Sequence, residues 1–132
     1  MKFLFICKHN RFRSKIAESW FNKLNNGKHE VKSSGLLEGS YPLEKSQVRV
    51  AKRLGVPIDR HPKATSTKLL DWADYIIIVA NDVPKELFEG YNKKAKRIVW
   101  KIEDKYNDNE NNIERIINEV GLKVKNLMEN LE

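Results

Sequence analysis

The sequence predicts an α/β fold with three layers, in which helices cover both faces of a four-stranded parallel sheet. Short apolar runs alternate along the chain with stretches whose apolar residues recur at helical spacing, which is the pattern of strands alternating with helices. The run over residues 75–80 is apolar throughout, so we expect a strand that is buried on both faces. Right-handed crossovers would connect the parallel strands. The length of 132 residues fits one domain over residues 1–132.

The first half of the chain is expected to hold two strands and two helices. Residues 2–6 form a short apolar run and should be a central strand. From Ser14 onward the apolar residues fall at helical spacing, and the sequence Asn-Asn-Gly at 25–27 provides a stop signal for that helix. Residues 30–34 are predicted to be the second strand. Residues 43–54 are predicted to be a helix, which the glycine that follows would close.

The second half is expected to begin with a loop and to end with a long helix. Two prolines and several hydroxyl residues indicate a loop over residues 56–67, followed by a short helix over residues 67–72. Strands over residues 75–80 and 97–100 would complete the sheet. Residues 109–131 carry an apolar stripe at helical spacing, which predicts a long amphipathic helix. This stripe is expected to pack on the sheet, although it could also form a coiled-coil or dimer seam.

The composition favours an anionic ligand and argues against several other classes of protein. Lys and Arg total 25 against 18 Asp and Glu, which gives a formal net charge of +7. This sign of charge suits nucleic acid, an acidic surface or an anionic substrate, but the positive charges are scattered, so nucleic-acid binding is not expected. The longest apolar run is too short to span a membrane, and the chain turns polar soon after its apolar start. We therefore expect a cytoplasmic protein without a membrane partner.

The segment most informative for chemistry runs from Cys7, the single cysteine of the chain, to Ser14. It lies between a predicted strand and a predicted helix, at the carboxyl edge of the sheet, where open α/β folds bind ligands. A loop there directs backbone N–H groups and the positive end of the helix dipole at one point, which favours an oxyanion. Arg13 could donate two parallel hydrogen bonds to that oxyanion, and the same field favours the thiolate of Cys7. Ser14 is placed to donate a hydrogen bond to the sulfur and to cap the helix.

The spacing C-x5-R followed by serine, between a strand and a helix near the N-terminus, resembles the low-molecular-weight protein tyrosine phosphatase family. Further matches follow in the family's order over about residues 1–105. They are Asn10 within the loop, Arg13-Ser14-x-x-Ala17-Glu18 after it, Ser33-Ser34-Gly35, Gly55-Val56-Pro57-Ile58-Asp59-Arg60-His61 and Ala73-Asp74-Tyr75-Ile76-Ile77. The resemblance implies the three-layer fold and hydrolysis of a phosphate monoester through a cysteinyl-phosphate. It implies no cofactor and no metal, and the single cysteine excludes a disulfide within the chain.

The resemblance also implies a carboxylic acid that protonates the leaving group, since an unprotonated alkoxide or phenoxide is expelled slowly. The family takes this acid from an Asp-Pro pair after the fourth strand. In this sequence Asp104 matches that aspartate, and Lys105 replaces the proline, which loosens the loop that must present the carboxylate. Glu103 and Asp108 are the competing carboxylates, and we favour Asp104.

Further residues are expected to bind the substrate or to support the loop. The expected substrate-binding residues are Lys8, His9, Asn10, Arg11, Phe12, Ser14 and Tyr106. The resemblance implies that Ser33 and His61 brace the loop, although His61 could equally be a surface histidine. Tyr106, Tyr41 and Phe12 could line a slot for a phenyl phosphate, or Phe12 could pack in the core and Tyr41 lie on the surface. The protein is expected to be a monomer. Its expected partner is a phosphotyrosine protein or a small aryl phosphate, and phosphate or sulfate should bind the loop.

Two branches of the family's fold differ in the reaction that they perform. Three features look more like the arsenate reductases of the thioredoxin-coupled type: the pair His9-Asn10, the short length and the pattern Trp100-x-x-x-Asp104. In those enzymes a Cys-x6-Cys pair resolves the arsenate adduct. The matching positions here are Ala80 and Leu87, so this relay is impossible and reduction would need an external thiol. We therefore predict phosphate monoester hydrolysis, most specifically by a protein tyrosine phosphatase. The alternatives are an arsenate reductase that uses an external thiol and a weakly active oxyanion-binding regulatory module.

Overall fold

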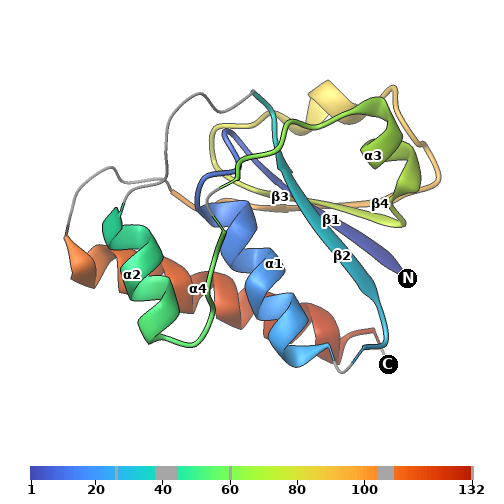
Figure 1. Ribbon diagram of the computed structural model, residues 1–132. Coiled ribbons are helices and arrows are strands. Elements are labelled where there is room, and N and C mark those ends of the chain that lie inside the picture. The colour runs from blue at the N-terminus through green and yellow to red at the C-terminus, as the bar shows by residue number, and fades with distance from the viewer. Residues whose placement is uncertain (26, 38–44, 60, 104–108, 132) are drawn as a thin grey trace.

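A computed structural model describes the chain except for residues 26, 38–44, 60, 104–108 and 132. Within the described residues, four strands form one parallel sheet in the order β2-β1-β3-β4. The strands are β1 (Lys2–Cys7), β2 (Glu30–Gly35), β3 (Tyr75–Val79) and β4 (Lys96–Trp100). Figure 1 shows the twisted sheet between helices, which confirms the predicted three-layer α/β fold.

The helices divide between the two faces of the sheet (Figure 1). One face is covered by α1 (Arg13–Leu24), α2 (Lys45–Arg53) and α4 (Glu110–Glu129). The other face carries α3 (Thr67–Trp72) and the short 3₁₀ helix η1 (Lys85–Phe88). Among the described residues, no helix is long and apolar enough to cross a membrane.

The central strand β1 contributes side chains to two separate cores. Phe3 and Phe5 belong to the core shared with α1, α2 and α4, while Leu4 and Ile6 belong to the core under α3. Alternate side chains of a strand point to opposite faces of its sheet, so one apolar run can serve both cores. The neighbouring strand β3 is buried along its whole length, as its uninterrupted apolar run predicts.

The apolar stripe of α4 packs inside the molecule rather than forming a free seam. Ile113, Ile117 and Val124 are buried in the core shared with α1 and β1. Gly121 lets α1 approach closely, because a Cβ atom there would lie 2.7 Å from the ring of Trp20. The indole N–H of Trp20 donates a hydrogen bond of 2.9 Å to the carbonyl of Ile117. These contacts join the long final helix to the helix that follows the loop.

The start of α1 differs from the prediction. The helix begins at Arg13, and Phe12 occupies the N-cap position without a side-chain capping hydrogen bond. The prediction that Ser14 caps this helix is therefore wrong, because its hydroxyl lies within the first turn and contacts the sulfur of Cys7. The 3₁₀ helix η1 escapes prediction, since four residues are too few to show a period. Residues 43 and 44 of the predicted second helix lie outside the described residues.

The parallel register brings the carboxyl ends of all four strands to one edge of the sheet. Cys7 pairs with Gly35 at the ends of β1 and β2, and Val79 pairs with Trp100 at the ends of β3 and β4. The segments that follow these residues therefore leave the sheet side by side. This edge is where open α/β sheets bind ligands.

Candidate active site

The loop that follows β1 turns back toward its own cysteine. Asn10 adopts a left-handed backbone conformation with φ of 53°, which asparagine tolerates better than most residues other than glycine. Its backbone N–H donates a hydrogen bond of 3.2 Å to Sγ of Cys7. Cys7 is 2% exposed, so the sulfur lies beneath the loop rather than on an open surface.

The end of β2 supports this loop from the side. The two residues after Gly35 donate backbone N–H hydrogen bonds of 2.9 Å to the carbonyls of Cys7 and Lys8. A Cβ atom on Gly35 would lie 2.6 Å from the backbone N of Asn10 and 2.6 Å from the carbonyl carbon of His9. Because these are backbone atoms, a side chain at position 35 would have to displace the loop.

Ser14 provides a second hydrogen bond at the sulfur of Cys7. Oγ of Ser14 lies 3.0 Å from Sγ, and it also accepts a hydrogen bond of 2.7 Å from Nδ2 of Asn10. Since Asn10 supplies the proton in that second contact, the single hydroxyl proton of Ser14 is free to point at the sulfur. Two donors directed at one sulfur stabilise a thiolate.

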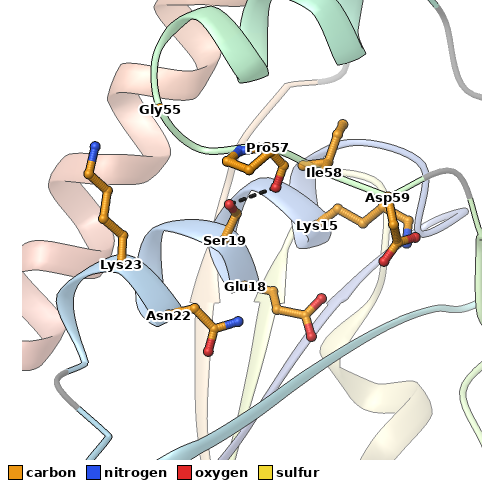
Figure 2. Close-up of a pocket in the computed structure, with 9 residues that line it drawn as sticks. All are labelled: Lys15, Glu18, Ser19, Asn22, Lys23, Gly55, Pro57, Ile58 and Asp59. Carbon is orange, nitrogen blue, oxygen red and sulfur yellow. Dashed lines mark hydrogen bonds and ion pairs between the residues drawn. The ribbon is translucent and has the colours of Figure 1, made fainter.

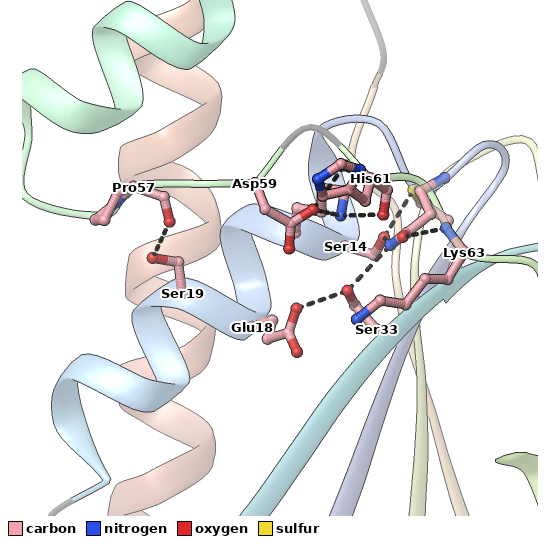
Figure 3. Close-up of polar contacts among 11 residues, drawn as sticks. Ser14, Glu18, Ser19, Ser33, Pro57, Asp59, His61 and Lys63 are labelled. Atoms are coloured by element: carbon pink, nitrogen blue, oxygen red, sulfur yellow. Dashed lines mark hydrogen bonds and ion pairs between the residues drawn. The ribbon is translucent and has the colours of Figure 1, made fainter. Parts of the chain in front are cut away.

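The side chain of Asn10 is buried and held from both ends. Its Oδ1 accepts a hydrogen bond of 2.9 Å from the backbone N–H of Lys63, and Nδ2 donates a bond of 3.0 Å to Oγ of Ser33. Ser33 in turn donates to Oε1 of Glu18 at 2.8 Å (Figure 3). A backbone N–H can only donate, so Lys63 fixes which way the amide of Asn10 faces. The contact between Ser33 and the loop residue Asn10 agrees with the bracing predicted for Ser33.

Arg13 is anchored by groups that follow the neighbouring strands β3 and β4. Its Nη1 donates a hydrogen bond of 2.8 Å to the carbonyl of Ile102, and its Nη2 contacts Oδ1 of Asp82 at 3.0 Å. Sequence reasoning missed both partners. Asp82 could have been singled out as the first carboxylate after the buried strand β3, at the edge where ligands bind.

The other residues of the loop take up different positions. Lys8, His9 and Arg11 are half-buried. Nδ1 of His9 is buried and has no hydrogen-bond partner among the described residues. Phe12 is 4% exposed and packs in the core with α1. Of its two predicted positions, a substrate slot or the core, the structure therefore shows the core. Only the backbone of Phe12 is left to meet a ligand.

His61 contributes to the site through its backbone. The residue is exposed, its N–H donates to Oδ1 of Asp59 at 2.8 Å, and its carbonyl accepts from Nζ of Lys15 at 3.0 Å. These contacts brace the segment beside the loop, but they do not use the imidazole. Of the two predictions for His61, an imidazole that braces the loop or a histidine on the surface, the structure shows the surface histidine.

Three predicted residues lie outside the described residues: Asp104, Tyr106 and Tyr41. The same holds for Lys105 and Asp108. Glu103 is described and exposed. The assignment of the general acid and of the aromatic slot therefore stays a prediction.

A groove of about 700 Å³ runs along α1 (Figure 2), and the described residues that line it do not include Cys7. Lys15, Glu18 and Ser19 of α1 line one side, and Pro57 and Asp59 line the other. The groove is therefore distinct from the loop, but three of its residues, Lys15, Glu18 and Asp59, belong to the polar contacts around the loop. In the part of the chain that the structure describes, no cluster of three His, Cys, Asp or Glu residues could hold a metal ion.

The chain and its fold are similar to phosphatases and to arsenate reductases. Residues 2–132 match the family model described as Low molecular weight phosphotyrosine protein phosphatase. Over 129 residues the chain is 26% identical to Arsenate reductase 1 of Bacillus cereus, covering 95% of this chain and 92% of that protein. The crystal structure of the low molecular weight protein tyrosine phosphatase from T. tengcongensis matches with a TM-score of 0.85 at 26% identity, covering 98% of this chain and 99% of that one. A thioredoxin-dependent arsenate reductase from Corynebacterium glutamicum matches with a TM-score of 0.76 at 24% identity, covering 98% of this chain but only 60% of that longer one.

Proposed function

We propose that this chain, which belongs to the low molecular weight phosphotyrosine protein phosphatase family, hydrolyses phosphate monoesters through a covalent cysteinyl-phosphate. The observation that carries the proposal is the pair of donors at the sulfur of Cys7, namely the N–H of Asn10 and the hydroxyl of Ser14. A thiolate held at the start of a loop of backbone amides is a suitable nucleophile for phosphorus. The proposed substrates are aryl phosphates, including phosphotyrosine in proteins.

The first half-reaction transfers the phosphoryl group to the enzyme. The loop amides and Arg13 bind the phosphate dianion, with Lys8 and Arg11 adding positive potential around it. Sγ of Cys7 attacks phosphorus in line, so that the S–P bond forms as the bond to the leaving oxygen breaks. Arg13 and the amides stabilise the charge on the three remaining oxygens. Asp104 donates its proton to the leaving oxygen.

The second half-reaction returns the enzyme to its starting state. The carboxylate of Asp104 takes a proton from water, whose oxygen attacks phosphorus and breaks the S–P bond. The hydroxyl of Ser14 and the N–H of Asn10 stabilise the thiolate of Cys7 as it leaves. The scheme uses no cofactor and no metal ion, because Arg13 and the amides carry the charge.

Arsenate reduction is a second candidate function, favoured by the similarity to arsenate reductases. In this reaction the thiolate of Cys7 would attack arsenate, and an external thiol would then attack the adduct. The positions at which a Cys-x6-Cys pair would stand hold Ala80, which is buried, and Leu87, which is exposed. The chain thus lacks its own resolving thiol. Hydrolysis needs only Cys7, Arg13, an acid and water, so we favour it.

Both reactions can be measured on one preparation of the protein. We expect hydrolysis of p-nitrophenyl phosphate to exceed reduction of arsenate in the presence of thioredoxin or glutaredoxin. If arsenate reduction is faster, the function of the protein is arsenate reduction rather than hydrolysis. Binding of phosphate without either reaction would instead indicate an oxyanion-binding module.

A further inference from the structure

We infer that the ion pair between Lys15 and Asp59 positions Asn10 and thereby sets the reactivity of Cys7. The inference rests on the proposed function, in which Cys7 is the nucleophile. Neither Lys15 nor Asp59 lies in the loop, so both would act as positioning residues.

The ion pair fastens the segment before α3 to the first turn of α1. Lys15 is 2% exposed, and its Nζ lies 2.5 Å from Oδ1 of Asp59 and 3.0 Å from the carbonyl of His61. The same Oδ1 accepts the backbone N–H of His61 at 2.8 Å. Figure 2 shows Lys15 and Asp59 meeting at the end of the groove, and Figure 3 shows Asp59 and His61 beside α1. One ammonium therefore holds both the carboxylate of Asp59 and the carbonyl of His61.

His61, held in this way, lies close in the chain to the group that orients Asn10. Two residues after His61, the N–H of Lys63 donates to Oδ1 of Asn10 at 2.9 Å, and the carbonyl of Lys63 accepts from the N–H of Gly35 at 2.7 Å. Lys63 is thus held between the end of β2 and His61, which Lys15 fastens. If Lys15 no longer holds His61, the amide of Asn10 loses the donor that fixes its direction.

The direction of that amide matters because the sulfur depends on it. With Oδ1 facing Lys63, the Nδ2 protons of Asn10 point to Ser14 and Ser33. Ser14 can then direct its own proton at Cys7. If the amide of Asn10 rotates, its oxygen takes the proton of Ser14, and the sulfur loses one of its two described donors. A weaker hold on Asn10 also weakens its backbone N–H bond to the sulfur.

The ion pair stays charged under the mildly acid conditions that suit such an assay. Burial raises the pKa of Asp59, but the hydrogen bonds from Lys15 and from the backbone of His61 outweigh it, and the charges of Lys15 and Lys63 act in the same direction. The net effect holds the pKa of Asp59 below its usual range. A carboxyl group with a lowered pKa stabilises the folded state fully at any pH above its ordinary pKa, and this contribution is lost as the pH falls through the lowered pKa. The contact between Lys15 and Asp59 is therefore present at mildly acid pH. Glu18, the other carboxylate in the groove, contacts Ser33 instead.

The rate at which iodoacetate alkylates Cys7 at about pH 6 tests the inference without any substrate. Asp59→Ala removes a negative charge near the loop, which by direct electrostatics would favour the thiolate and speed alkylation. Loss of positioning has the opposite effect, because the sulfur loses donors. We expect Asp59→Ala to slow alkylation about three- to tenfold, as for weakening one hydrogen bond to an ionised group. Asp59→Asn removes the same charge but keeps an oxygen acceptor, so it should retain most of the wild-type rate.

Two lysine variants complete the test. Lys15→Met fits the buried position and should also slow alkylation, while Lys23→Met, the same change at an exposed site on the same helix and groove, should leave the rate unchanged. Thermal unfolding above the assay temperature shows that each variant is folded. If Asp59→Ala reacts as fast as wild type or faster, the inference is wrong. Should that variant not fold, a wild-type rate in Lys15→Met overturns the inference.

The same experiment separates this inference from the proposed function. If wild-type Cys7 alkylates at an ordinary thiol rate and phosphate does not protect it, the proposed function fails. If wild-type Cys7 reacts rapidly and is protected by phosphate, but the rate does not depend on Asp59 and Lys15, only the positioning role fails.

Discussion

The guanidinium of Arg13 donates a hydrogen bond of 3.0 Å to the carboxylate of Asp82, a residue 69 positions further along the chain. Arg13 is 2% exposed and Asp82 is 38% exposed, so the arginine is fixed while the carboxylate still meets solvent. The carbonyl of Ile102 holds the other terminal nitrogen. This arrangement orients the guanidinium before a substrate binds, which is the condition for effective stabilisation of a transition state. It also makes Asp82 a competitor of phosphate for Arg13.

Two substitutions of Asp82 should separate its orienting role from its charge. Asp82→Ala removes the acceptor, and we expect kcat for p-nitrophenyl phosphate to fall about tenfold, which corresponds to ~1.4 kcal/mol. Asp82→Asn keeps an oxygen acceptor and removes the competing charge, so kcat should stay within a few-fold of wild type and phosphate should inhibit at lower concentration. Steady-state kinetics with and without phosphate check both. Wild-type kinetics in Asp82→Ala would show that Arg13 does not depend on this contact.

Gly35→Ala should disturb the loop without touching any reacting group. The added Cβ would lie 2.6 Å from backbone atoms of His9 and Asn10, which cannot yield without moving the loop. Overpacking of this kind costs about 1–3 kcal/mol of stability, and activity should fall with it. Gly90→Ala is the matched control, because nothing lies within 4 Å of a Cβ at that position. Thermal unfolding and turnover of both variants test the prediction, and equal behaviour of the two would contradict it.

Arg13→Lys should not behave as a conservative substitution. An ammonium cannot donate two parallel hydrogen bonds to two phosphate oxygens, nor can it hold Asp82 and Ile102 in the same geometry. We expect kcat to fall by at least ~100-fold, the scale of losing a principal oxyanion donor. A variant within a few-fold of wild type would show that Arg13 does not stabilise the transition state.

Asp104 and Glu103 can be distinguished by the leaving group. A general acid contributes about 10²–10⁴-fold, and most where the leaving oxygen most needs its proton. Asp104→Asn should therefore slow phenyl phosphate strongly and a dinitrophenyl phosphate much less, and the acidic limb of its pH–rate profile should change with it. Glu103→Gln should show neither effect. The reverse result would assign the acid to Glu103 and shift the alignment of this segment by one residue.

The sequence predicts the architecture well because local patterns determine it. The apolar run of β3 indicated a buried strand, and the helical spacing after Ser14 and in α4 indicated helices; the structure contains all three. The C-x5-R-S spacing likewise located the loop between strand and helix. These features depend on residues close together in the chain.

The contacts that hold the candidate site in place could not be predicted in the same way. Lys15 and Asp59 are 44 positions apart, and only the crossover between β2 and β3 brings them together. The closeness of Gly35 to the loop depends on the register of β1 against β2, which apolar periodicity does not specify. The erroneous capping role of Ser14 has a similar cause, because the hydroxyl is engaged by Cys7 and Asn10.

Turnover of p-nitrophenyl phosphate at mildly acid pH by wild type and by Cys7→Ser tests whether Cys7 is the nucleophile of a phosphate monoester hydrolase. The change replaces one sulfur by oxygen and leaves the loop amides and Arg13 in place. We expect steady turnover by wild type, none by Cys7→Ser, and binding of phosphate by both, since the oxyanion donors remain. Turnover by Cys7→Ser near the wild-type rate, or phosphate binding by wild type without turnover, would contradict the claim that Cys7 is the nucleophile of a phosphate monoester hydrolase.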